Sequence, residues 1–348
     1  MLKNIKNTYT YGSIKEAPEV LAKVLEEKNK IREIADKIKK INPKYIFFAG
    51  SGSSFDVSKY GEILFNNFID IPAAAKTSLD YTNYTPGATK KTVTVVISVS
   101  GSKGDATAIA KKAKQNGSFV FSIVNTPNSP LEKLSDVSYF VNSGKSKSFI
   151  NTTAYVAQLF VVALFADFLS NRKITSLESL PKKIKETFGL ENKIKQIAQN
   201  DKQRKVFVFT GKGPSKVIAD QTAIKLRETA WDIKHSESIP IDEIPHGRLF
   251  SLGDKETLFI PMIAGQKGKK KAEDIVDLLE GTGAKVLSFA SPEYKLKNQI
   301  TLPKMNEFLF PILAQPIAYI FVFYMNIFKG FNIDEPRNVK RIDTFLRK

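Results

Sequence analysis

Cysteine is absent from the 348-residue sequence, and histidine occurs only twice, as His235 and His246. The absence of cysteine excludes disulfides, thiolate metal sites and a cysteine nucleophile. With two histidines and only scattered carboxylates left as ligands, we expect no metal and no other cofactor. A chain without cysteine is also typical of an intracellular protein, and we expect a cytoplasmic location.

A long apolar run is missing from the N-terminus, so the sequence predicts no signal peptide there. One internal stretch, residues 308–328, is apolar enough to resemble a membrane span. It contains Pro311, Gln315, Pro316 and Asn326, however. We therefore predict a core helix that the prolines begin, and no association with a membrane.

Acidic residues are too few to balance the basic ones, and the formal net charge is +18. The lysines are spread over many segments and alternate with acidic or apolar residues at helical spacing. This pattern is typical of solvated helix faces. Attraction of a phosphorylated metabolite is the second interpretation. Nucleic-acid binding ranks third, because no module of basic and aromatic residues is present, and we do not expect it.

Strand-like and helix-like segments alternate along the first half of the chain. An amphipathic helical region, 15–40, with Pro18 near its start, precedes short strands predicted at 45–49, 72–75, 92–97, 119–124 and 136–141. Helices are predicted from the first glycine- and serine-rich loop to Phe68, at 105–116 and at 151–169. This alternation predicts a parallel sheet flanked by helices.

The pattern then repeats. Gly50 and Gly211 both follow a strand-like segment and lie 161 residues apart, and the pairs Gly101 with Gly265 and Gly117 with Gly283 lie 164 and 166 apart. Nearly constant offsets indicate two copies of one α/β domain, each a flavodoxin-like three-layer sandwich. We expect the first domain at 41–175 and the second at 176–330, with a helical region at 1–40 and a tail at 331–348.

One segment of the first copy, 92–107, joins a buried strand to a helix through a loop rich in serine and glycine. Such a loop presents hydroxyls, backbone N–H groups and a helix N-terminus to an anion. An ordinary turn with Asp105 as N-cap explains the residues equally well. Ser54, Ser98 and Ser100 lie at the carboxyl ends of strands, where parallel sheets bind ligands. The corresponding turn at 263–265 lacks serines, so we expect the ligand in the first copy.

Six short motifs, in order, resemble those of the double-SIS (sugar isomerase) family, and in particular the isomerase half of glucosamine-6-phosphate synthase. They extend from about residue 40 to the end of the chain. The motifs are Gly52-Ser53-Ser54, Ser98-Val-Ser-Gly-Ser102, Asn125 with Ser129-Pro-Leu131, Ala223-Ile-Lys-Leu-Arg-Glu228, Pro245-His246-Gly247 and Asp334-Glu-Pro-Arg-Asn338.

The resemblance implies a role for each matched residue. Glu228 would move a proton between C1 and C2 of a sugar, with Lys225 one turn before it. His246 would assist ring opening from the neighbouring subunit of a homodimer with shared active sites. Lys340 and Arg341, in the tail, would close over the sugar, and we count Arg341 with the catalytic group. The phosphate and sugar would be held by Gly52, Ser53, Ser54, Ser98, Ser100, Gly101, Ser102, Lys103 and Lys340. His235 and Glu237 are interpreted as structural.

The sequence also departs from the family pattern. We expect no glutamine-derived ammonia from this chain, because the family's glutaminase domain and its cysteine are not found in it. Val99 and Lys103 replace the glutamine and threonine of the serine loop, and two extra residues lie near Trp231-Asp232. Lys103 would add a charge to the phosphate, so Lys103→Thr should raise the Michaelis constant.

These observations predict a phosphosugar enzyme that transfers a proton between C1 and C2 of a hexose or hexosamine 6-phosphate. It would be an aldose–ketose isomerase or a glucosamine-6-phosphate deaminase. Two alternatives remain open, a fructosamine-6-phosphate deglycase and a non-catalytic phosphosugar-binding protein. The residues alone do not separate them.

Overall fold

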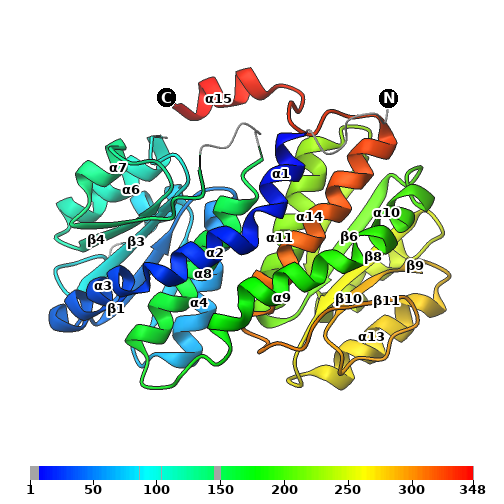
Figure 1. Cartoon of the computed structure of the whole chain (residues 1–348), viewed down its shortest axis with the longest axis horizontal. Helices are drawn as coiled ribbons and strands as arrows, with labels where there is room; N and C mark the ends of the chain where they lie inside the picture. Colours follow the sequence, from blue (N-terminus) through cyan, green and yellow to red (C-terminus); the bar gives the residue numbers. More distant parts are fainter. Residues whose placement is uncertain (1–7, 86, 103, 145–149, 348) are drawn as a thin grey trace. The chain divides into compact units, whose positions relative to one another are not determined.

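Two parallel β-sheets organise the chain in a computed structural model, which describes residues 8–85, 87–102, 104–144 and 150–347 (Figure 1). We call them sheet A and sheet B. The described residues divide into two compact units. The sheet A unit contains Glu19–Ser146, Thr153–Glu178 and Asn338–Lys348, and the sheet B unit contains Met1–Pro18, Lys147–Thr152 and Ser179–Arg337.

Sheet A has the strand order β2-β1-β3-β4-β5, and all of its pairings are parallel. Its central strand is buried along its whole length, as expected for a run of β-branched residues with helices on both sides. The strands are β1 (Tyr45–Ala49), β2 (Ala73–Lys76), β3 (Thr92–Ser98), β4 (Phe119–Val124) and β5 (Val137–Phe140).

Helices follow each of the first four strands and pack on sheet A. They are α4 (Ser53–Phe68), α5 (Ser78–Tyr84), α6 (Gly104–Gln115) and α7 (Pro130–Leu134). The same unit contains α3 (Lys28–Ile41), most of α2 (Ala17–Glu26), α15 (Val339–Arg347) and α8 (Thr153–Leu169). Nearly every residue of α8 is buried, because this apolar helix lies between α3 and α4.

Sheet B has the order β11-β10-β8-β6-β7, and β9 also pairs with β8. All of its pairings are parallel. Its strands are β6 (Val206–Gly211), β7 (His235–Pro240), β8 (Thr257–Ile263), β9 (Lys285–Val286), β10 (Ser288–Ala290) and β11 (Gln299–Thr301).

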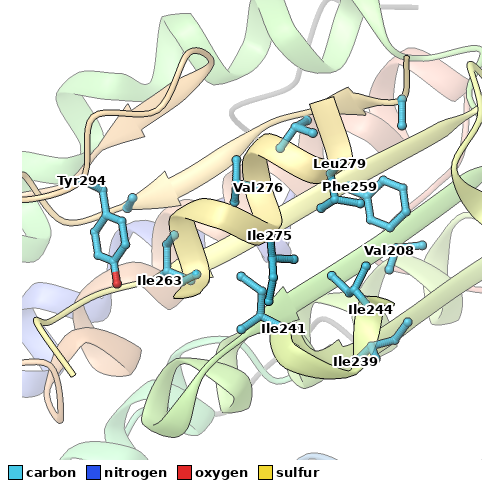
Figure 2. Close-up of a cluster of buried hydrophobic side chains, with 14 residues drawn as sticks. Val208, Ile239, Ile241, Ile244, Phe259, Ile263, Ile275, Val276, Leu279 and Tyr294 are labelled. Carbon is cyan, nitrogen blue, oxygen red and sulfur yellow. The ribbon is translucent and has the colours of Figure 1, made fainter. Parts of the chain in front are cut away.

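The helices of the sheet B unit bury both faces of its sheet. On one side α13 packs its apolar stripe, including Ile275 and Leu279, against Val208, Ile239 and Phe259 of the strands (Figure 2). The main helices are α1 (Tyr9–Lys15), α9 (Leu180–Thr187), α10 (Glu191–Asn200), α11 (Lys216–Thr229), α12 (Leu249–Leu252), α13 (Lys269–Gly281) and α14 (Phe310–Lys329). Short turns of helix, η2 (Leu177–Ser179), η3 (Phe188–Leu190), η4 (Gly213–Ser215), η5 (Ile241–Glu243) and η6 (Ile244–Arg248), lie in the connections.

The two sheets share one topology. The short strands β9 and β10 are separated by one residue and both pair with β8. If these two are counted as one strand and each sheet is numbered from its own first strand, both sheets follow the flavodoxin-like order 2-1-3-4-5. The predicted fold class and internal repeat are therefore confirmed.

The ends of the chain are arranged differently from the prediction. The region 1–40 is not a separate body, because α1 belongs to the sheet B unit and α3 to the sheet A unit. The tail divides between Arg337 and Asn338. In α14, Pro311 lies in the first turn, but Pro316 is inside the helix and does not begin it. By length and composition α14 could cross a membrane, yet 94% of its most apolar window is buried inside the protein.

Candidate functional site

The topological switch point of sheet A lies where β1 and β3 are neighbours. Ala49, the last residue of β1, is level with Val96 of β3. The connections that leave these two strands diverge toward opposite edges of the sheet, which opens a crevice at their carboxyl ends. Both predicted phosphate loops begin at this point.

The loop after β1 depends on two glycines. A side chain at Gly50 would meet the backbone of Ser54 at 2.8 Å, so only glycine lets the loop fold back this closely. Gly52 has φ +57 and ψ −128, a conformation that favours glycine. Ser53 and Ser54 follow in the first turn of α4 and are half-buried. The N–H groups of Ser54 and Phe55 donate to Ser51 O and Gly52 O, so the two serine hydroxyls are the donors that this turn offers to a ligand.

The loop after β3 is held by its own serines. Gly101 N–H donates to Ser98 Oγ at 3.0 Å, and Ser102 N–H donates to Ser100 Oγ at 3.3 Å. Ser98 is buried, Ser100 is half-buried and Ser102 is exposed. Each serine that accepts an N–H keeps its own O–H to donate to an anion. The alternative in which Asp105 caps the next helix is wrong, because α6 begins at Gly104 and Asp105 lies inside its first turn.

The Asn125 and Ser129 motif supports this loop. Leu131 N–H donates to Gly101 O at 2.9 Å, and a Cβ at Gly101 would lie 2.4 Å from Ser129 Oγ. The Asn125 side chain accepts from Ser143 N–H at 2.8 Å, and the Asn125 backbone N–H donates to Val99 O. Gly101, with φ +61, is therefore fixed by shape as well as by backbone conformation.

The predicted catalytic pair lies on α11, in the sheet B unit. Lys225 Nζ donates to Glu228 Oε2 at 2.7 Å. The Lys225 side chain is 7% exposed and the Glu228 side chain is 35% exposed. A buried ammonium thus holds a carboxylate whose other face is open to solvent.

Glu228 and His246 lie beyond opposite ends of the edge strand β7. Helix α11 runs back from the carboxyl end of β6, so that Glu228, near its C-terminus, lies where β7 begins. Arg227 confirms this placement by donating to Ser236 O at 2.8 Å. His246 follows the far end of β7, in the exposed turn η6, where Gly247 has φ +117. A strand of this length spans roughly 17–20 Å.

The interpretation of His235 and Glu237 as structural is consistent with their contacts. The Glu237 carboxylate lies 2.9 Å from His235 Nε2 on the same strand, and 3.3 Å from Arg248, which follows His246 and Gly247. Glu237 therefore connects the strand to the turn that carries His246.

The structure does not place the other predicted residues, Lys340, Arg341 and Lys103, beside either the serine loops or Glu228 within the part of the chain that it describes. Lys340 and Arg341 are exposed on α15, which contacts α6. Lys103 lies outside the described residues. A surface cavity of about 390 Å³ near α5 is lined by Thr82, Thr85, Lys112 and Asn116 among others, toward the end of α6 away from the serine loop.

Sheet B also has a switch point, between β6 and β8, but side chains of the protein occupy it. Gly265 N–H donates to Glu293 Oε1 at 2.9 Å, and Tyr294 O–H donates to Gly265 O at 3.1 Å (Figure 2 shows this tyrosine near Ile263). Lys212 Nζ donates to Ala264 O at 2.5 Å and lies 3.9 Å from Glu307.

Burial and charge act against each other at this sealed point. Burial lowers the pKa of Lys212 below its ordinary value, although Glu307 and Glu293 act in the opposite direction. Burial acts to raise the pKa of Glu293, but hydrogen bonds, including the one from Gly265 N–H, outweigh it and lower that pKa. The Lys212 ammonium and the Glu293 carboxylate are thus both engaged in hydrogen bonds with the backbone at 264–265.

Sequence reasoning missed one arrangement next to the predicted catalytic helix. Trp231 stacks with Phe331 at 4.7 Å, and the Arg337 guanidinium lies 4.5 Å from the Trp231 ring centroid. The extra residues near Trp231 and the motif around Arg337 were both visible as separate signals. Only the fold brings them together.

Comparison with known proteins gives one family match. Residues 41–167 match the SIS domain. Among curated proteins, the chain is 27% identical over 334 residues to a glutamine–fructose-6-phosphate aminotransferase (isomerizing) of Caldanaerobacter subterraneus, and 26% identical over 319 residues to one of Arabidopsis thaliana. The first alignment covers 91% of this chain and 54% of the relative, and the second covers 85% and 46%. The chain thus spans about half the length of the curated relatives it matches.

Solved structures share the fold over nearly the whole chain. The C-terminal domain of glucosamine-fructose-6-phosphate aminotransferase from Francisella tularensis superposes with a TM-score of 0.84 at 20% identity, covering 94% of this chain and 98% of that domain. Glucosamine-6-phosphate deaminase from Thermotoga maritima superposes with a TM-score of 0.79 at 18% identity, covering 95% and 98%.

Proposed function

Because residues 41–167 match the SIS domain and the chain resembles the isomerizing aminotransferases over most of its length, we propose that it is a phosphosugar enzyme. It transfers a proton between C1 and C2 of a hexose or hexosamine 6-phosphate. Its reaction is an aldose–ketose isomerisation or the release of ammonia from glucosamine 6-phosphate. We place it in the cytoplasm, as a homodimer.

The observation that carries this proposal is the serine-lined switch point of sheet A. Ser98 and Ser100 lie at and just after the end of β3, and Ser54 lies in the first turn of α4, shortly after the end of the neighbouring strand β1. A phosphate group offers several acceptor oxygens, and each can accept from a serine hydroxyl of this kind. Lys103 is proposed to add a positive charge there.

The Lys225–Glu228 pair supports the proposed chemistry. In an isomerisation, a carboxylate takes a proton from one carbon of the open-chain sugar and returns it to the neighbouring carbon through an enediol. Glu228 has the required group with an open face, and Lys225 keeps it in place. In the deaminase reaction, water adds at C2 of the resulting imine and ammonia leaves.

The position of His246 supports the homodimer. The length of β7 separates it from Glu228 in one chain, since the two residues lie beyond opposite ends of this strand. We therefore propose that each site takes His246 from a second copy, to assist ring opening. Lys340 and Arg341 are proposed to cover the sugar.

The experiment incubates the protein with fructose 6-phosphate, glucose 6-phosphate or glucosamine 6-phosphate in D₂O. Proton NMR then follows deuterium uptake at C1 and C2, and an ammonia assay runs in parallel. Glu228→Gln should reduce exchange by about 10²- to 10⁴-fold, the usual contribution of a general base. Glu186→Gln, an exposed glutamate on α9, is the matched control and should remain fully active.

The products distinguish the alternatives. Ammonia with fructose 6-phosphate as product identifies a deaminase, and exchange without ammonia identifies an isomerase. If every ester raises the melting temperature but none exchanges deuterium, the chain is a non-catalytic phosphosugar-binding protein. Full activity of Glu228→Gln would overturn the proposed mechanism.

A further inference from the structure

The only tryptophan of the chain, Trp231, lies two residues past the end of α11 and three past Glu228. Its side chain packs on Phe331 on one side and carries the Arg337 guanidinium over its ring. Trp231 nevertheless remains 55% exposed. A cation above an indole face contributes about 0.5–1 kcal/mol at an exposed site. The contact therefore joins the segment after α14 to the connection that follows α11.

A second contact holds the same segment. The Asp334 carboxylate accepts from Tyr9 N–H at 2.9 Å and from Thr10 N–H at 2.8 Å. It also accepts from the Thr10 hydroxyl at 2.5 Å. Asp334 thus caps the N-terminus of α1 from 324 residues away, as an N-cap side chain would do locally.

The connection after α11 is itself fixed. Asp232 pairs with Lys329 at 3.0 Å, and the Lys329 side chain is only 3% exposed. Lys329 also donates to Arg204 O at 2.9 Å. The residue next to Trp231 is therefore held by an ion pair to α14 within the sheet B unit.

We propose that Trp231 and Arg337 are positioning residues that fix the point from which the C-terminal tail leaves the sheet B unit. The proposal rests on the proposed function. Arg337 is the last residue assigned to this unit, and Asn338, with φ +62, begins the part assigned to the sheet A unit. Asp334 and Arg337 anchor the segment before Asn338, and the tail cations Lys340 and Arg341 come soon after it.

Chain length explains why an anchor at Arg337 matters. Lys340 is three residues past Arg337, so an extended chain carries it at most about 11 Å from the anchor. If only Asp334 held the segment, the reach would be six residues, or about 21 Å. The reach doubles, so the accessible volume rises about eightfold, and the effective concentration of the tail cations at any one point falls accordingly. Under the proposed function, the anchor keeps these cations near the helix that carries Glu228.

The first experiment uses the full chain without sugar. Trypsin cleavage after Lys340 and Arg341 is timed by mass spectrometry in the wild type, Trp231→Leu and Trp231→Phe. Leucine keeps the apolar contact with Phe331 but has no ring face for Arg337, whereas phenylalanine keeps the ring. We expect cleavage about fivefold faster in Trp231→Leu and close to the wild-type rate in Trp231→Phe. Urea unfolding of each variant checks that the fold is intact.

The second experiment measures the link to the site, with fructose 6-phosphate as the probe. Trp231→Leu and Arg337→Met should each raise KM about two- to fivefold and leave kcat unchanged, since the contact is worth only about 0.5–1 kcal/mol. Trp231→Phe and Arg337→Lys should restore KM. A general loss of stability would instead lower the active fraction and hence kcat. In that case Trp231→Phe and Arg337→Lys would show the same KM as Trp231→Leu and Arg337→Met.

The outcomes are distinct. Equal cleavage of Trp231→Leu and wild type, with the fold intact, overturns the anchor. Faster cleavage with an unchanged KM overturns the positioning role. If no phosphosugar is turned over, the proposed function fails and the positioning role fails with it, while the cleavage experiment still decides whether the anchor exists.

Discussion

Sheet A and sheet B have the same strand order, but their switch points are filled in opposite ways. In sheet A, Gly101 N–H is held by Ser98 Oγ, a group that can still donate to an anion. In sheet B the matching glycine, Gly265, gives its N–H to the carboxylate of Glu293. The switch point of sheet A is thus lined with hydroxyl donors, whereas the switch point of sheet B contains the negative charge of Glu293.

This contrast indicates how the two copies of the domain divide their tasks. The sheet B unit carries its Lys225–Glu228 pair at the amino end of its strands and not at its switch point. Its sealed carboxyl end is therefore structural. Under the proposed function, sheet A binds the phosphate and the sheet B unit contributes the base.

The strongest perturbation compares the two matched glycines. In Gly101→Ala, the new Cβ would lie 2.4 Å from Ser129 Oγ at a positive φ, so we expect a loss of stability of about 2 kcal/mol or more and no detectable binding of fructose 6-phosphate. Gly265→Ala would push on Glu307 and also lose stability, but the folded fraction should bind the sugar normally. Calorimetric titration measures both. Equal loss of sugar affinity would abolish the distinction between the switch points.

The serines provide the next effect. Ser98→Ala or Ser100→Ala removes a hydroxyl from the phosphate, and hydrogen bonds to charged groups are worth about 1.5–3 kcal/mol. The dissociation constant for fructose 6-phosphate should therefore rise about tenfold or more in each variant. The connection after β8 has no serine to match, so Ser215→Ala, in the connection after β6, is the control and should leave it unchanged. A rise in the control would show that the loops are not specialised.

Lys212 tests the sealed point directly. Lys212→Met removes the donor to Ala264 O and leaves Glu307 without this cation. We expect unfolding in urea to become easier by about 1–3 kcal/mol. The affinity for the sugar should stay the same. Weaker sugar binding at unchanged stability would place Lys212 in the ligand site.

The weakest effect concerns pH. Because the pKa of Glu293 is lowered in the folded protein, its ionised form stabilises the fold above the ordinary carboxyl pKa, and this contribution is lost as pH falls through the folded pKa. Glu293→Gln should therefore cost less than about 1 kcal/mol at neutral pH, given partial solvent screening. The difference from wild type should vanish in acid. Urea titrations at neutral and acidic pH measure it, and a larger gap in acid would contradict the assignment.

Local residue types were enough to predict the fold and the serine loop. A run of β-branched residues identifies a buried strand. Gly101 and the serines identify the turn that follows it, and this recognition needs no knowledge of contacts with other segments. The sealing of sheet B could not be predicted, because Glu293 reaches Gly265 across 28 residues through tertiary folding. Pro316 was misleading for a similar reason. It lies inside α14 because burial of the whole helix outweighs the local cost of proline.

In the candidate site, too, contacts between residues close in sequence could be predicted, and contacts between distant segments could not. The Lys225–Glu228 pair follows from helical spacing, since residues three apart share a face. The contact between Trp231 and Arg337 joins two distant segments, and only the packing at the end of α14 brings them together. Motifs identify residue types, whereas the fold decides which of them meet.

Phosphate binding by sheet A alone is the proposal on which the division of tasks depends. A crystal structure of the protein with fructose 6-phosphate would decide it. We expect phosphate density against Ser54, Ser98 and Ser100, with Glu228 within reach of C1 and C2. Phosphate density at Lys212 and Gly265, beside the carboxyl ends of β6 and β8, would contradict this division.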